Sequence, residues 1–70
     1  MDAIHVGAVK VREVIQMLEQ HGWRLVRQRG SHRQFRHPTQ PGLVTVAGNR
    51  NADLAFRTLR SIFKQAGIYQ

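Results

Sequence analysis

The chain has 70 residues, which is enough for one small domain spanning residues 1–70 and too few for a second. It contains no cysteine, which excludes disulfides, thiolate zinc sites and thiol nucleophiles and is compatible with a reducing cytoplasm. Eleven Lys and Arg residues against four Asp and Glu residues give a net charge of +7, and only Lys10 and Lys64 are lysines. Because arginine grips phosphate with two donors at once, this balance favours a polyanionic partner, although an acidic protein fits the same charge.

The sequence does not predict contact with a membrane. Its apolar runs are too short to cross a bilayer, and Asp2 and His5 do not fit the basic start of a signal peptide. The arginines are spread over several segments and not along one helix face, which argues against a helix lying on a membrane surface. We therefore expect a cytoplasmic protein without a membrane anchor.

The first predicted element is an amphipathic helix from Lys10 to His21, which follows a lead-in of residues 1–9 without a clear period. Its apolar residues have the i, i+3, i+4, i+7 spacing of one helix face: Val11, Val14, Ile15 and Leu18. Gly22 followed by Trp23 is a typical helix stop, at which His21 favours the helix dipole. Trp23 is expected in the core, and stacking on an RNA base is the alternative.

Three strands are predicted next, over Trp23–Gln28, Ser31–His37 and Leu43–Ala47. The turn at Arg29-Gly30 joins the first two, and a cluster of turn residues from Pro38 to Gly42 joins the last two. Phe35 is expected to face the core, so the alternation of side chains along a strand sends His32 to the opposite face. A bulge near the turn would shift this assignment.

A loop over Gly48–Asn51 and a second helix complete the predicted fold. The helix is expected to begin at Ala55 or Phe56 and end at Ala66, with Asp53 as its cap or first-turn anion. The order helix, strand, strand, strand, helix predicts an α+β fold. In that fold a three-stranded antiparallel sheet carries both helices on one face.

The residues exclude most kinds of enzyme site. There is no glycine-rich nucleotide loop, and the four histidines lack the i, i+4 spacing of a helical metal pair. Acidic residues are too few for paired-carboxylate chemistry, and Ser31 and His32 point to opposite faces of a strand. We therefore expect no metal and no cofactor.

What remains is histidine with arginine, which suits RNA cleavage without a metal. The ribose 2′-hydroxyl attacks the adjacent phosphate when one group removes its proton and another protonates the leaving oxygen. Imidazole suits either task because its usual pKa of about 6.5 is close to the working pH.

His32 is the candidate, since it follows the Gly30 turn and has Arg29, Arg33 and Arg36 nearby, with Arg27 across the hairpin. The alternative is that His32 only caps the turn or bonds to the backbone. His37, before Pro38, is expected to be a turn residue.

Four segments together resemble HicA-type toxins of bacterial toxin–antitoxin pairs. They are KVREVIQMLEQHGW from Lys10, RLVRQRGSHRQFRHP, LVTV and TLRSIFKQAGI, and the resemblance covers about Lys10 to Ile68. It implies a fold like double-stranded RNA-binding domains, an activity that cuts mRNA and arrests growth, and neutralisation by a HicB-type antitoxin that covers the site. The histidine of the family's glycine-serine-histidine motif falls on His32, which inherits the catalytic role. RNA contacts are expected at Arg27, Arg29, Gly30, Ser31, Arg33, Arg36 and Arg50.

One departure from the family pattern affects the expected chemistry. After the third strand the family usually reads proline-glycine-histidine-proline, whereas this chain has Ala47-Gly48-Asn49-Arg50. Asn49 cannot transfer a proton at neutral pH, and Arg50 adds a candidate phosphate contact. Two other functions therefore stay open: an RNA-binding module that does not cut, and a basic surface that binds only an acidic protein.

Overall fold

The structure is a computed structural model that describes residues 9–68. Most of the expected lead-in, with His5, lies outside the described residues. The secondary-structure elements, in chain order, are β1 (Val9–Lys10), α1 (Val11–Gln20), β2 (Arg24–Arg29), β3 (His32–Arg36), β4 (Val44–Ala47), β5 (Asp53–Leu54) and α2 (Phe56–Ala66). The predicted order of helix, three strands and helix is confirmed, and the short strands β1 and β5 are additions to it.

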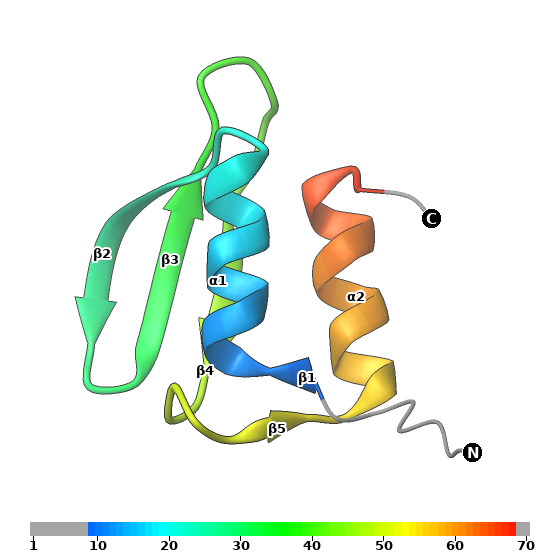
Figure 1. The fold of residues 1–70 in the computed structure, drawn as a ribbon. Coiled ribbons are helices and arrows are strands. Elements are labelled where there is room, and N and C mark those ends of the chain that lie inside the picture. The colour runs from blue at the N-terminus through cyan, green and yellow to red at the C-terminus, as the bar shows by residue number, and fades with distance from the viewer. Residues whose placement is uncertain (1–8, 69–70) are drawn as a thin grey trace.

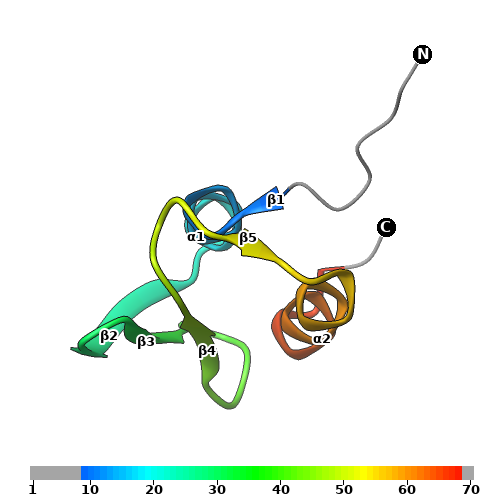
Figure 2. The same ribbon diagram turned by 90° about the horizontal axis from the view of Figure 1, so that it is seen from below.

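Strands β2, β3 and β4 form an antiparallel sheet in that order, and both helices pack against one of its faces. Figure 2 shows α1 over the sheet and α2 beside β4, whereas β2 lies at the edge far from α2. Phe35 and Arg33 of β3 are buried on the helix side, at 1% and 5% exposure, and His32 is exposed. The expectation that Phe35 faces the core and His32 faces away is therefore confirmed.

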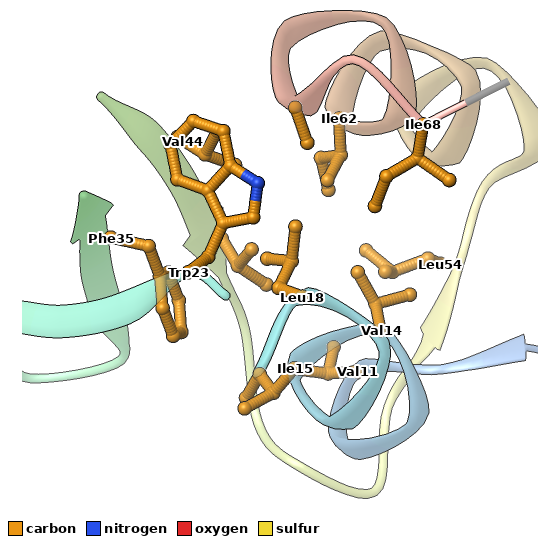
Figure 3. Close-up of a cluster of buried hydrophobic side chains, with 12 residues drawn as sticks. Val11, Val14, Ile15, Leu18, Trp23, Phe35, Val44, Leu54, Ile62 and Ile68 are labelled. Atoms are coloured by element: carbon orange, nitrogen blue, oxygen red, sulfur yellow. The ribbon is translucent and has the colours of Figure 1, made fainter. Parts of the chain in front are cut away.

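The core lies between the two helices and the inner face of β3 and β4. The predicted stripe of α1 is buried there, together with Trp23, Phe35, Val44, Val46, Leu54, Ile62, Ala66 and Ile68. Trp23 is fully buried, and Figure 3 shows its indole ring between the sheet and Leu18 of α1. The prediction of a core tryptophan is confirmed, and the alternative of base stacking is excluded because no part of the ring reaches the surface.

The end of α1 is fixed by its glycine and by two histidines. Gly22 has a φ of +94°, and a Cβ built there would lie 2.8 Å from Nε2 of His37. The His21 ring donates through Nδ1 to the Met17 carbonyl (2.9 Å), which also accepts the backbone N–H of His21 (3.2 Å). Nε2 of His37 donates to the His21 carbonyl (2.9 Å), so the turn after β3 is joined to the end of the helix.

The prediction that Asp53 caps the second helix is wrong. Asp53 belongs to β5, which pairs with β1, and its carboxylate forms an ion pair with Nζ of Lys10 at 2.7 Å. The N-cap of α2 is Ala55, and the first turn of α2 has no acidic residue. The pairing of Lys10 with Asp53 comes from the β1–β5 register, which joins residues far apart in the sequence. The helix-capping preferences of the residues near α2 therefore could not predict it.

Candidate active site

The open face of the sheet carries rows of side chains that the strand register sets side by side. One row contains Arg29 of β2, His32 of β3 and Ala47 of β4. The next contains Arg27, Gln34 and Thr45. Residues directly opposite each other in neighbouring strands share a face, so both rows lie on the side away from the helices. The small side chain of Ala47 leaves space next to the His32 ring.

A bulge in β2 decides which arginines share this face. The pairing runs from Leu25 opposite Phe35 directly to Arg27 opposite Gln34, so Val26 has no partner in β3. Leu25 is therefore on the helix side with the buried Phe35, and without the bulge Arg27 would also be on that side. The extra residue shifts the alternation by one position. As a result, both Arg27 and Arg29 lie on the face of His32.

These side chains surround an open pocket of about 400 Å³. Its lining consists of Arg27, Arg29, His32, Gln34 and Thr45. The strands β2, β3 and β4 contain no Asp or Glu, so no carboxylate of this sheet neutralises the two guanidinium groups. The pocket therefore combines one imidazole, two permanently charged guanidinium groups and two neutral hydrogen-bonding side chains. This arrangement is suited to a phosphate and an adjacent hydroxyl.

The other described histidines have structural roles. Nδ1 of His37 accepts hydrogen bonds from the backbone N–H groups of Thr39 (3.1 Å) and Gln40 (3.2 Å). Its ring also packs against Trp23, with the ring centroids 5.2 Å apart. This confirms the prediction of a turn residue. Because His21 is likewise bonded to the backbone, His32 is the imidazole that faces the pocket.

Arg33 does not join the other arginines. It is on the helix side of β3 and is almost fully buried, with Nη1 donating to the carbonyls of Ser31 (3.2 Å) and Gly48 (2.9 Å). The Gly48 N–H also donates to the Ser31 carbonyl, at 3.1 Å. Arg33 therefore ties the end of the Gly30 turn to the start of the loop after β4 and holds the residue just before His32.

We expect the Arg33→Met variant to keep the fold but to loosen this turn. Hydrogen bonds to charged groups contribute about 1.5–3 kcal/mol each, and desolvation of the buried guanidinium offsets much of that, so unfolding free energy should change by less than about 1.5 kcal/mol. The Gly48 amide should exchange with solvent roughly tenfold faster, as measured by NMR. Arg36→Met, on the exposed side of the same strand, is the matched control. Equal Gly48 protection in both variants would contradict the role of Arg33.

The remaining predicted residues lie around the pocket or apart from it. Gly30, with a φ of +59° and no atom near its missing Cβ, forms the open turn next to His32, and Ser31 follows it. Arg36 is on the same face as His32, opposite Arg24, but beyond the pocket lining. Arg50 is exposed in the loop after β4, and its carbonyl accepts from the N–H of Arg12 at the start of α1.

Asn49, which stands where the family usually has a second histidine, does not line the pocket. Its Oδ1 accepts the N–H of Asn51 at 3.0 Å, and its carbonyl accepts the N–H of Ala52 at 2.9 Å. Oδ1 of Asn51 in turn accepts a hydrogen bond from Arg12, at 2.6 Å. Asn49 thus shapes the loop between β4 and β5, which is hydrogen-bonded to the start of α1, and it adds no acid or base to the site.

Two lining residues were missing from the predicted site, Gln34 and Thr45. Gln34 was accessible to sequence reasoning because it lies two positions from His32 in the same strand and so shares its face. Thr45 was not, because only the register between β3 and β4 sets it opposite Gln34. The sequence contains no signal for that register.

Comparison with known protein families identifies the chain's family. Residues 11–68 match the family model described as HicA toxin of bacterial toxin-antitoxin. The chain belongs to the HicA toxin family. A toxin role in a toxin–antitoxin system follows from that membership. A search of the curated proteins found no match to this chain.

Two further findings, on membrane spans and on metal sites, apply to the described part of this HicA toxin. Its helices are all too short or too polar to cross a lipid bilayer. Within residues 9–68, no three or more His, Cys, Asp or Glu side chains are grouped so that they could hold a metal ion.

Proposed function

We propose that this HicA toxin is a metal-independent endoribonuclease that cleaves mRNA, with His32 as general acid or base. The observation that supports this most is the position of His32 in an open pocket, exposed and flanked by Arg27 and Arg29. An exposed imidazole next to two guanidinium groups that form no ion pair among residues 9–68 fits a proton-transfer group beside a phosphate, whereas a structural histidine is usually bonded to the backbone.

The proposed reaction uses the substrate's own nucleophile. His32 takes the proton of the ribose 2′-hydroxyl, the 2′-oxygen forms a bond to phosphorus, and the bond from phosphorus to the 5′-oxygen breaks. The leaving oxygen takes a proton from water or from the imidazolium of His32. The products are a 2′,3′-cyclic phosphate and a free 5′-hydroxyl. Negative charge grows on the phosphate oxygens during this step, and Arg27 and Arg29 stabilise it.

The proposed RNA contacts divide into three groups. Arg27 and Arg29 hold the reacting phosphate, with Gln34 and Thr45 available to its oxygens or to the ribose. Gly30 and Ser31 let the RNA backbone approach the turn, because no side chain projects from Gly30. Arg36 and Arg50 reach phosphates further along the strand. Arg33, being buried, acts through the position of the turn and makes no direct contact.

We propose that a HicB-type antitoxin neutralises the toxin by covering the pocket and that both act in the cytoplasm, where mRNA is available. An antitoxin bound over His32 excludes RNA from the pocket that contains the acid or base. Adding the antitoxin at equal concentration should stop cleavage of a short RNA, and a large excess of RNA should compete with the antitoxin and restore part of the cleavage.

The direct test is RNA cleavage by the purified toxin, free of antitoxin and with a chelator present. A single-stranded RNA should yield products ending in a 2′,3′-cyclic phosphate. The same sequence with 2′-O-methyl groups should bind but stay intact, because it lacks the attacking hydroxyl. Cleavage of the 2′-O-methyl strand would contradict the proposed reaction.

One alternative has an observation in its favour. Since His32 is the one histidine among the residues that line the pocket and no carboxylate lines it, the protein is a candidate RNA-binding module that does not cut. In that case the same assay shows salt-sensitive RNA binding and no cleavage products at any protein concentration.

The arginines of the pocket should supply a measurable part of RNA affinity. We expect Arg27→Gln to weaken binding of single-stranded RNA and to reduce the slope of log K against log salt by about 0.7, the value for one phosphate contact. Arg29→Gln should act similarly, and Arg57→Gln on the exposed side of α2 is the matched control. Binding is measured by fluorescence anisotropy with 2′-O-methyl RNA. Equal slopes for Arg27→Gln and the control would mean that the pocket makes no phosphate contact.

A further inference from the structure

Strand β2 has an edge that no other described strand covers, and its residues are all exposed. It is the outer strand of the β2–β3–β4 sheet and pairs with β3 alone among the described strands. Both views show β2 at the end of the sheet, beyond the helices (Figures 1 and 2). Two of its six residues are apolar, and they are about half exposed: Leu25 at 46% and Val26 at 53%. A strand edge of this kind presents backbone donors and acceptors that a further strand can pair with.

The side chains next to this edge indicate what such a strand contains. Arg27 and Arg29 lie on the open face, whereas Leu25 lies on the helix side opposite Phe35. The guanidinium of Arg24 instead donates to the carbonyl of Glu19 at the end of α1 (3.2 Å). Residues of an added strand share a face with the residues they oppose. Acidic side chains on one face would therefore meet the arginines, while apolar side chains on the other face would cover Leu25.

The same charges disfavour a second copy of this chain. A centred antiparallel pairing of two β2 strands would set Arg24 of one copy opposite Arg29 of the other at both ends. Like charges directly opposite each other destabilise a strand pair. A nucleic acid is also a poor fit to the edge itself, because its backbone lacks the alternating N–H and C=O groups of a polypeptide and would leave Leu25 and Val26 uncovered.

We propose that β2 binds an extended acidic segment of a partner protein as a fourth strand of the sheet. The segment alternates acidic and apolar residues and spans the six residues of β2, a length of roughly 20 Å. Its carboxylates lie beside Arg27 and Arg29, at the mouth of the pocket that contains His32. Binding of the segment does not depend on RNA cleavage. Its consequence, exclusion of RNA from the pocket, rests on the proposed function.

The test uses a capped peptide of about eight residues that alternates glutamate and valine. It is titrated into the full-length His32→Ala toxin, so that the result does not depend on RNA cleavage. We expect amide exchange in β2 to slow by about tenfold or more at saturation, measured by NMR, with no change in α2. Arg27→Glu and Arg29→Glu should each lower the affinity for the peptide by about tenfold, whereas Arg57→Glu on α2 should change it by less than about threefold.

A second peptide separates strand pairing from attraction between charges. It has the same sequence, with N-methyl groups on alternate backbone amides, which remove donors on one edge but keep every carboxylate. We expect it to bind at least about tenfold more weakly. Equal binding of the two peptides would overturn the proposal, as would β2 protection by single-stranded RNA but not by the peptide. A toxin dimer formed through β2 in the absence of peptide would also overturn it.

Discussion

Replacing His32 with alanine is expected to lower the rate of RNA cleavage by about 10²–10⁴-fold, the usual contribution of a positioned acid or base. The ring lies in the pocket between Arg29 and Ala47, and the described lining of the pocket contains no other histidine and no carboxylate to take its place. RNA binding should be retained, because Arg27 and Arg29 supply the attraction to phosphate. Single-turnover cleavage of a labelled RNA, together with its binding affinity, separates the two effects.

The controls for this prediction come from the chain itself. His32 is exposed, so His32→Ala should change the free energy of unfolding by less than about 0.5 kcal/mol. His32→Gln keeps a hydrogen-bonding group but cannot transfer a proton, and it should lose as much activity as the alanine variant. His21→Ala removes an exposed imidazole outside the pocket and should cleave at close to the wild-type rate. Cleavage by His32→Ala within about threefold of wild type would contradict the proposed role.

In cells, the same variants should differ in growth. Induction of the wild-type toxin without antitoxin is expected to arrest growth, and induction of His32→Ala at the same protein level is not. Growth arrest by both forms would indicate that toxicity comes from binding and not from cleavage.

The largest loss of stability is expected for Trp23→Ala. Trp23 is fully buried among the residues of α1, β3 and β4, and its ring also packs against His37. Truncating a buried tryptophan to alanine costs about 3–5 kcal/mol. A domain of this length has a total stability of only about 4–10 kcal/mol, so the variant should be partly or wholly unfolded at 37 °C. Circular dichroism during urea or thermal unfolding measures the loss.

Trp23→Phe is the informative companion variant. The Nε1 atom of Trp23 is buried and has no hydrogen-bond partner among residues 9–68, so phenylalanine loses ring volume but also removes an unsatisfied donor. We expect it to cost about 1–2 kcal/mol, clearly less than the alanine variant. Equal destabilisation by both substitutions would mean that the indole N–H is satisfied in solution, for example by a buried water.

Much of this fold could be predicted from the sequence because its signals are local. The apolar stripe of α1 and the glycine that ends it specify a helix whichever sheet it packs on, and α2 begins and ends within the predicted bounds. Alternation along β3 likewise predicted that Phe35 faces inward and His32 outward. That single result gave the central residue of the site, since side chains of one strand alternate with a fixed period of two.

The partners of His32 depended on longer-range pairing. Simple alternation from Leu25 puts Arg27 and Arg29 on the core side of β2, and only the bulge at Val26 moves them to the face of His32. A bulge is a mismatch between two strands, so neither strand encodes it alone. The same holds for Thr45, which reaches the pocket through the β3–β4 register.

The sequence by itself determined the helix–strand order, the turn at Gly30 and the outward direction of His32, because each depends on residues within a few positions of one another. Only the tertiary structure decided that Arg27 and Arg29 flank His32, that Arg33 is buried and that Asp53 pairs with Lys10. Those outcomes depend on register between segments, and a shift of one residue sends a side chain to the other face of a sheet.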